Sequence, residues 1–370
     1  MKVLSLGSDP ALFVPNSSVA LRQIECGRLV DELHIISYTP ANSSSGYPVT
    51  GLRLSGNVWA YPTNSVSKWR YFFDAYKIAR DILKKGGRFI ITSQEGMTNF
   101  LALYLSVRYK LGLEVQVHTD ISSALFKRES LRNRVSLPGY RLAMRRARSI
   151  RVVSKRIAKF LMRKWGVPGS KITILPIYVD KDKWQNGDAK RDLHKEFPQF
   201  ENIILMASRL TREKNIPLAM NVFNKVRERY PRTGLVVVGS GEYESVIKGV
   251  GVVHLPWSED LASLYKSADI FLLTSDYEGF GLTLVESALC NLPIVTTDVG
   301  LVGDILTPYN ALIAKPGDAA KLAEHICFLL QNRAATVMMR ERLAKVADRL
   351  PEKEVYMKLF KASWQKCLSK

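Results

Sequence analysis

Cysteine is scarce in this sequence of 370 residues, and no two cysteines form a close-spaced pair. The four that occur are Cys26, Cys290, Cys327 and Cys367. Zinc sites and the disulfide frameworks of small secreted domains both depend on several cysteines at characteristic spacings. The sequence therefore predicts neither kind of site, and it fits the reducing environment of the cytoplasm.

Long hydrophobic runs are also missing. A membrane-spanning helix needs about 18 consecutive apolar residues, and no stretch approaches that length. The beginning, MKVLSLGSDPALF, has one lysine and a short apolar run that soon reaches Asp9 and Pro10, which is typical of a first β-strand rather than of a signal peptide. Repeats and low-complexity segments are absent as well. A globular protein with room for two domains is expected.

Acidic residues are scarce in one half of the chain only. Residues 1–190 contain 31 lysines and arginines against 13 acidic residues, a balance of +18, whereas residues 191–370 contain 23 against 21. Such an asymmetry indicates two domains with different partners.

Short apolar runs alternate with helical segments through both halves. Runs of this kind are typical of parallel sheets covered by helices on both faces. Two sets of them predict two doubly wound domains, with the polar stretch 179–194 as the joint. The predicted strands are 2–6, 33–38, 89–93, 113–119, 150–154 and 171–177 in the first half, and 202–208, 235–241, 251–256, 270–275, 292–297 and 311–316 in the second.

Ligands of open parallel sheets bind beyond the carboxyl ends of the strands. After the strand at 202–208, Arg209 and Lys214 place two cations near a helix start, which suits a phosphate or diphosphate. Taken alone, this pair favours a solvated basic turn. Gly239 and Gly241 follow the next strand and allow backbone to approach a ligand closely, although many strand-to-helix turns need glycine for structure alone.

The stretch YEGFGLTLVE places Glu278 in a loop and Glu286 on the helix that follows, with Gly279 and Gly281 between them. Carboxylates accept strong hydrogen bonds from the vicinal hydroxyls of sugars and ribose. A helix cap at Glu278 and a surface role for Glu286 are the alternatives. The spacing together with the glycines favours two carboxylates that converge on one polar ligand.

The stretch SDYEGFGLTLVESALCNLPIV resembles the E-x7-E signature of retaining glycosyltransferases, most closely family 4 with the GT-B fold. SRLTREK resembles the R-x4-K segment of that family, VVVGSGE its glycine-rich turn, and LASLYKSADIFLLTS the segment before the signature. These features follow the family's order across about residues 200–315 and are jointly specific. The first half matches more loosely.

The resemblance implies an α/β GT-B fold of two Rossmann-like domains with a cleft between them. Its implied domains are 1–180 for the acceptor and 181–350 for a nucleotide-sugar, followed by a C-terminal helix at 351–370 that packs back on the first domain. Arg209 and Lys214 would hold the donor diphosphate, Glu286 the ribose and Glu278 the transferred sugar. The other implied donor-binding positions are Gly279, Phe280, Gly281, Leu282, Gly239, Gly241 and Pro256. The family uses neither metal nor cofactor, because the cations neutralise the diphosphate.

In the first half, His118 matches a histidine that the family often turns toward the donor sugar, and a hydrogen-bonded structural histidine is the alternative. Asp120 and Glu95 follow strands on the same side and are candidate acceptor residues. The loop GSDPALFVPNSS stands where relatives often have a Gly-Gly loop that approaches the donor phosphate, and Asp9, Asn16 and Ser17 are candidates for that contact. Asp9 is also a candidate residue on the acceptor side. Asp304 stands where many relatives have glutamate.

Residues 127–164 contain 14 lysines and arginines and one acidic residue, Glu129. Arg141, Arg145 and Arg148 recur at helical spacing, and apolar residues lie between the cations. This pattern predicts attraction to an anionic membrane surface, with nucleic acid as the alternative partner. The aromatic residues of 69–76 are expected to pack on the sheet. The predicted membrane-facing patch comprises Arg141, Arg145, Arg146, Arg148, Arg156, Lys159 and Arg163.

Together these features predict a retaining, metal-independent hexosyltransferase. It would move sugar from a UDP- or GDP-sugar to a lipid or lipid-linked glycan at the inner membrane face. A soluble or polysaccharide acceptor is one alternative. A nucleic-acid-binding protein that uses the basic half is the alternative of a different class.

Overall fold

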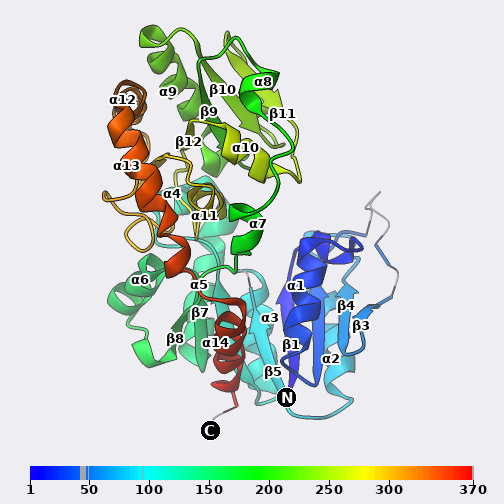
Figure 1. The fold of residues 1–370 in the computed structure, drawn as a ribbon. Coiled ribbons are helices and arrows are strands. Elements are labelled where there is room, and N and C mark those ends of the chain that lie inside the picture. The colour runs from blue at the N-terminus through cyan, green and yellow to red at the C-terminus, as the bar shows by residue number, and fades with distance from the viewer. Residues whose placement is uncertain (42–46, 49, 95, 369–370) are drawn as a thin grey trace.

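The computed structural model describes residues 1–41, 47–48, 50–94 and 96–368, and it forms two lobes (Figure 1). Each lobe is built on one sheet. Both ends of the chain lie at the bottom of the lower lobe in this view.

The sheet of the lower lobe has the order β3-β4-β2-β1-β5-β6-β7-β8. β3 pairs with β4 in antiparallel fashion, and the other pairings are parallel. β1, β5 and β6 are almost wholly buried because helices cover both faces. The strands are β1 (Lys2–Gly7), β2 (Glu32–Ser37), β3 (Leu52–Ser55), β4 (Val58–Pro62), β5 (Phe89–Ser93), β6 (Gly112–Val117), β7 (Ser149–Val152) and β8 (Ile172–Ile174).

The sheet of the upper lobe has the order β11-β10-β9-β12-β13-β14, and its pairings are parallel. The order reverses beside β9, and ligands of such sheets bind at this switch point. The strands are β9 (Asn202–Ala207), β10 (Thr233–Val238), β11 (Val252–Leu255), β12 (Ile270–Leu273), β13 (Ile294–Thr297) and β14 (Leu312–Ala314).

Helices connect these strands, as the sequence predicted for doubly wound α/β domains. The lower lobe contains α1 (Ser18–Gly27), α2 (Tyr71–Leu83), α3 (Thr98–Arg108), α4 (Ala124–Glu129), α5 (Leu131–Arg146) and α6 (Lys155–Trp165). The joint and upper lobe contain α7 (Lys181–Gln185), α8 (Leu193–Glu196), α9 (Ile216–Arg229), α10 (Leu261–Ser267), α11 (Leu282–Leu289), α12 (Ala319–Gln331) and α13 (Arg333–Ala344). Within the described part of the chain, none of the helices has the length and apolar character needed to cross a bilayer.

The last helix, α14 (Lys353–Gln365), returns to the lower lobe and packs on its sheet (Figure 1). Tyr356, Phe360 and Trp364 recur every four residues on one face, and all three are buried. The backbone comes so close to β6 that a Cβ on Gly112 would lie 2.0 Å from the carbonyl oxygen of Cys367. The C-terminal segment is therefore part of the first lobe's core.

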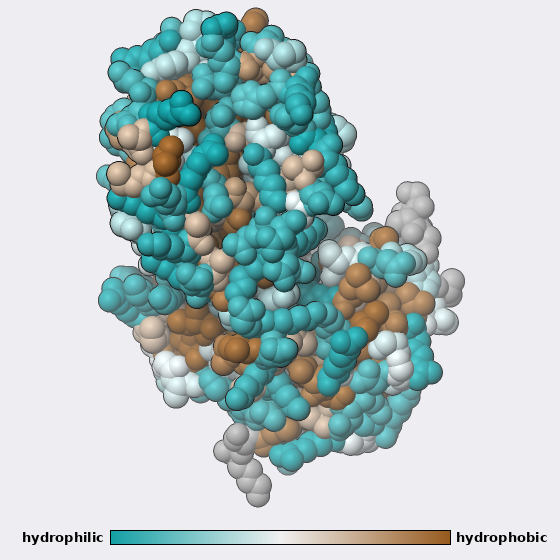
Figure 2. Space-filling view, in the orientation of Figure 1, coloured by the Kyte–Doolittle hydropathy of each residue, from teal (hydrophilic) through white to brown (hydrophobic). Residues whose placement is uncertain are grey.

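The carboxyl ends of β6 and β7 meet the carboxyl ends of β12 and β13. Arg156, in the first turn of α6 after β7, forms an ion pair with Asp298, which follows β13. The backbone N–H of Lys155 donates to Asp304 at 2.6 Å, and Tyr277 donates to Glu129. The lobes are thus in contact on this side, and Figure 2 shows an indentation between them on the side of α1.

Candidate active site

Three side-chain and backbone contacts fix the loop after β12 against the turn after β9. The N–H of Asp276 donates to the Glu213 carbonyl at 2.8 Å, and Asn215 donates to the Asp276 carboxylate at 2.9 Å. Thr274 donates to the Lys214 carbonyl at 2.9 Å. Two segments about 60 residues apart in sequence are therefore held together at one edge of the sheet, as the carboxyl ends of neighbouring parallel strands should be.

Lys214 and Glu278 face one another at this edge. Lys214 Nζ lies 2.5 Å from Glu278 Oε1, and the Ser275 hydroxyl donates to the same oxygen at 2.8 Å. Both charged side chains are only 12–13% exposed, so each depends on the other to offset the cost of its desolvation. The structure brings the predicted phosphate-binding lysine and sugar-binding glutamate into direct contact.

Arg209 behaves differently from Lys214. Its side chain is 75% exposed and pairs with Glu213 at 3.2 Å. An exposed arginine of this kind loses little when it changes partner. Exchanging Glu213 for an anionic ligand would therefore cost Arg209 little.

Glu286 lies on α11 and is 7% exposed. The buried Tyr265 hydroxyl donates to its Oε2 at 3.2 Å. Burial raises the pKa of Glu286 to about 7, against the opposing effects of the Tyr265 hydrogen bond and the Lys183 charge. Near neutral pH both the acid and the carboxylate form of Glu286 are therefore expected. Its burial rules out the alternative of a surface glutamate.

Gly239 and Gly241 have a structural reason to be glycine. A Cβ at Gly239 would lie 1.9 Å from the Ser208 carbonyl oxygen, and one at Gly241 would lie 2.5 Å from that of Leu210. The glycine-rich turn therefore packs backbone to backbone against the turn that carries Arg209. The role in donor binding that the resemblance implied for these glycines stays a prediction.

Gly279 lies where the lobes touch. A Cβ there would lie 1.6 Å from the His118 carbonyl oxygen, so no other residue fits without separating the two backbones. Gly281 has φ 88 and caps the start of α11. Phe280 is buried, and its carbonyl accepts from Leu301 at 2.9 Å. Among residues 279–282, Leu282 is the one whose side chain is exposed.

Replacing Gly279 by alanine is expected to push the lobes apart, because the new Cβ cannot coexist with the His118 carbonyl. Small-angle scattering should show a larger radius of gyration, and the thermal midpoint should fall. Gly56→Ala is the matched control, since nothing lies within 4 Å of its Cβ position. An unchanged scattering profile for Gly279→Ala would contradict this account of the contact.

His118 follows β6 and is fixed by a buried polar network. Its Nε2 lies 3.1 Å from Gln116 Oε1, which also accepts from Arg151. The amide nitrogen of Gln116 donates to Thr92 and Glu114, so its oxygen must face the histidine. His118 therefore carries its proton on Nε2 and keeps Nδ1 as an acceptor. Burial, with the charges of Arg151 and Arg22, lowers the pKa of His118 to about 3, so the ring is neutral.

The other candidates in the first half have local structural roles. Asp9 accepts from the N–H of Ala11 at 3.0 Å, and Asp120 accepts from the N–H and hydroxyl of Ser122. Both carboxylates thus stabilise turns. Glu95 lies outside the described residues. In the second half, Pro256 is exposed in the loop after β11.

The membrane role of the basic patch stays a prediction, but two of its members make contacts within the protein. α5 ends at Arg146, so Arg148 lies beyond the helix, and its guanidinium donates to the Cys367 carbonyl at 3.2 Å. Arg156 is committed to the lobe contact with Asp298.

The expectation that the aromatic residues of 69–76 pack on the sheet was wrong in part. Trp69 is 89% exposed and Phe73 is 61% exposed.

Several residues at this site had no sequence signal. Tyr265 and Ser275 are ordinary residues on a helix and at a strand end, yet they contact the two signature glutamates. Gln116 and Arg151 orient His118 from the interior of the sheet. Alternating polar residues along β6 were the available hint, because a buried parallel strand is usually apolar throughout.

Two parallel α/β sheets that meet at their carboxyl edges define the GT-B fold, and solved structures share it. Sucrose-phosphate synthase from Thermosynechococcus elongatus aligns with a TM-score of 0.80 at 16% identity, over 100% of this chain and 99% of that one. Anabaena HepE in complex with UDP and glucose aligns with a TM-score of 0.75 at 16% identity, over 99% and 100% of the two chains.

Sequence comparison finds a family match in the second lobe and curated relatives that align over a longer part of the chain. Residues 190–349 match the family described as "Glycosyl transferases group 1". A curated relative from Campylobacter jejuni, N,N'-diacetylbacillosaminyl-diphospho-undecaprenol alpha-1,3-N-acetylgalactosaminyltransferase, is 26% identical over 60% of this chain and 62% of its own length. The chain spans 37–62% of the length of the first curated relatives it matches.

Proposed function

We propose that the protein is a retaining glycosyltransferase that moves a hexose-type sugar from a UDP- or GDP-sugar to an acceptor. The observation that carries this proposal is the placement of the two signature glutamates. Glu278 stands beside Lys214 where the lobes meet, and Glu286 is buried eight residues further along beside Tyr265. One carboxylate is thus available for the transferred sugar and the other for the ribose.

The residues around these glutamates suit departure of a diphosphate. Lys214 already lies next to Glu278. Arg209 is exposed, so exchanging its partner Glu213 for a phosphate would cost little. Two cations offset the charge that builds on the leaving group, so the proposed reaction needs neither metal nor cofactor. The neutral His118 would accept a hydrogen bond from the sugar through Nδ1, without adding charge to the site.

The acceptor belongs to the first lobe in this proposal, and a lipid or lipid-linked glycan is the kind we favour. The balance of +13 across residues 127–164 supports docking at an anionic inner membrane face, as a peripheral cytoplasmic enzyme of cell-envelope glycan synthesis. The name of the Campylobacter relative includes a lipid diphosphate. A soluble or polysaccharide acceptor remains the alternative.

A thermal-shift screen with a panel of UDP- and GDP-sugars tests the proposal. A ligand that binds only the folded state raises the midpoint in proportion to the logarithm of its concentration over Kd. One nucleotide series should stabilise the protein, and transfer with that donor should yield product whose anomeric coupling matches the donor. Failure of every nucleotide-sugar to stabilise the protein would overturn the proposal.

Donor affinity should rise with pH through about 7, because ribose hydroxyls donate to the ionised form of Glu286 and its pKa in the free protein is about 7. Protonation competes with the donor, so affinity at pH 6 should be about tenfold lower than at pH 8. Isothermal calorimetry with an intact nucleotide-sugar measures this dependence. In Glu286→Gln the dependence should disappear, since the amide does not titrate.

The same shift makes a matching prediction for stability. The folded protein holds the Glu286 proton more tightly than the unfolded chain does. The contribution of Glu286 to the free energy of unfolding therefore falls as pH rises from about 4.5 to about 7. Glu286→Gln should therefore flatten the pH profile of unfolding in this window.

For donor binding, an affinity that is equal at pH 6 and pH 8 would contradict the assignment of Glu286 to the ribose.

A further inference from the structure

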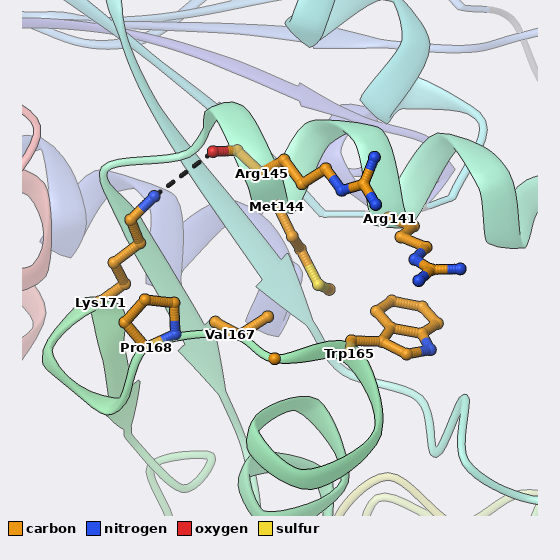
Figure 3. Close-up of a pocket in the computed structure, with 8 residues that line it drawn as sticks. Arg141, Met144, Arg145, Trp165, Val167, Pro168 and Lys171 are labelled. Atoms are coloured by element: carbon orange, nitrogen blue, oxygen red, sulfur yellow. Dashed lines mark hydrogen bonds between the residues drawn. The ribbon is translucent and has the colours of Figure 1, made fainter.

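A pocket of about 180 Å³ opens on the lower lobe between α5 and the end of α6 (Figure 3). Figure 3 shows the Arg141 and Arg145 side chains reaching out from α5 above Trp165, with Met144, Val167 and Pro168 lining the pocket between helix and loop. Lys171 stands at the other end and donates to the Arg145 carbonyl at 3.4 Å. Three cations thus surround an apolar floor.

This pocket lies at the edge of the sheet opposite the candidate active site. Arg145 lies at the end of α5 just before β7 begins, and Lys171 directly precedes β8. The active-site candidates follow the carboxyl ends of the strands, whereas these residues precede the amino ends. A ligand here would therefore bind without occupying the space for donor or acceptor.

The charge of the pocket is not neutralised by the protein. The eight described residues that line it include three cations and no carboxylate. Within the described chain, neither Arg141 nor Arg145 has an acidic partner, in contrast to Arg156, which is paired across the lobes. Guanidinium groups so placed suit a phosphate, which they can bind through paired hydrogen bonds.

Exposed apolar side chains also lie on both helices that form the rim of the pocket. Met162 is 41% exposed on α6, and its sulfur would lie 3.4 Å from a Cβ at Gly169 beside the pocket. Leu142 is 48% exposed on α5 next to Arg141. A free phosphate gains nothing from such a rim, whereas a phosphate attached to acyl chains can place the chains against it.

We propose that this pocket binds the phosphate headgroup of an anionic phospholipid and fixes how the first lobe sits on the bilayer. The inference deepens the membrane attachment proposed above and rests on it. Arg141, Arg145 and Lys171 hold the phosphate, while Trp165 lies at the depth of the interface, where its ring and its N–H are both accommodated.

Vesicle binding of the full-length protein tests the inference. The pocket variant Arg141→Gln/Arg145→Gln/Lys171→Gln should bind phosphatidylglycerol-containing vesicles about tenfold more weakly than the wild type, at physiological salt. The matched control neutralises Lys84, Lys85 and Lys110, three exposed cations of the same lobe that do not line the pocket. This control should lose about threefold or less, because it reduces only the diffuse attraction.

A second measurement locates the lipid. Phospholipid brominated on its acyl chains should quench part of the tryptophan emission, and Trp165→Phe should remove a component of that quenching. Inorganic phosphate, compared with chloride at equal ionic strength, separates the two sources of the phosphate group. Only general screening is expected, so phosphate should release the protein no better than chloride.

Each outcome decides between the possibilities. Equal losses in pocket and control variants would leave membrane docking intact and overturn the pocket. Specific release by inorganic phosphate would make this a site for the free ion and overturn the lipid inference. Failure of the wild type to bind anionic vesicles would overturn both docking and pocket. Donor-induced thermal stabilisation, measured on the same variants, reports separately on donor binding and should be unchanged.

Discussion

Replacing Lys214 by alanine is expected to lower kcat and kcat/KM together, by about 100- to 1000-fold, as for the loss of one preorganised group that stabilises developing charge. Negative charge grows on the leaving diphosphate as the bond to the sugar breaks, so its interaction with Lys214 strengthens toward the transition state. A lysine that is already held by Glu278 and only 13% exposed needs little reorganisation to act.

Steady-state kinetics with the identified donor measure this effect, and Lys248→Ala is the matched control. Lys248 is an exposed lysine of the same lobe. Arg209→Ala should act in the same direction but less strongly, because its side chain is exposed. A rise in KM with unchanged kcat would assign Lys214 to donor positioning alone. Rescue by Mg²⁺ would contradict the metal-free proposal.

The variant also changes Glu278. Without its cation, a carboxylate that is 12% exposed keeps, among the residues that the structure describes, only the Ser275 hydroxyl as a partner. Breaking a partly buried ion pair on one side can also destabilise the fold. A thermal unfolding curve measured beside the kinetics separates loss of the ion pair from unfolding.

The fold was predictable because its signals are local and repeated. Buried parallel strands require short apolar runs, and the runs at 202–208, 235–241 and 270–275 correspond to β9, β10 and β12, whose ends lie within about three residues of those predicted. The site was predictable in part for a similar reason. Residues that follow parallel strands gather at one edge, so Lys214 and Glu278 meet although 64 residues separate them.

Tertiary partners could not be predicted, since they depend on which surfaces the fold brings together. Arg156 belongs to a basic amphipathic helix by its spacing, yet it pairs with a residue 142 positions away in the other lobe. Arg148 is similar, because its partner is the backbone of the returning C-terminal segment. Charge counts along a chain therefore overestimate the cations that remain available to a membrane.

The burial of Glu286 was equally hidden from the sequence. Spacing places it on a helix, but only packing against Tyr265 reveals a carboxyl at 7% exposure. Such burial raises its pKa, and this is why the proposed donor binding is expected to depend on pH. The sequence signature identifies Glu286, but the raised pKa of its carboxyl follows from burial and can be seen only in the structure.

Replacing Glu286 by alanine should weaken donor binding by about 30- to 1000-fold, which corresponds to the loss of two charge-assisted hydrogen bonds worth about 2–4 kcal/mol together. The change also leaves the buried Tyr265 hydroxyl without its acceptor, so some loss of folding stability is expected too. Glu286→Gln separates these effects, because its amide oxygen still accepts from Tyr265 while the charge is gone.

Above pH 7, calorimetry should therefore show the highest donor affinity for the wild type, a lower affinity for Glu286→Gln and the lowest for Glu286→Ala. Thermal unfolding without ligand should show that Glu286→Gln is no less stable than the wild type. Glu228→Ala is the control, since that glutamate is exposed on α9 of the same lobe. If all three proteins bound the donor equally well, the ribose would have to be held elsewhere, and the buried carboxyl would remain only as a partner for Tyr265.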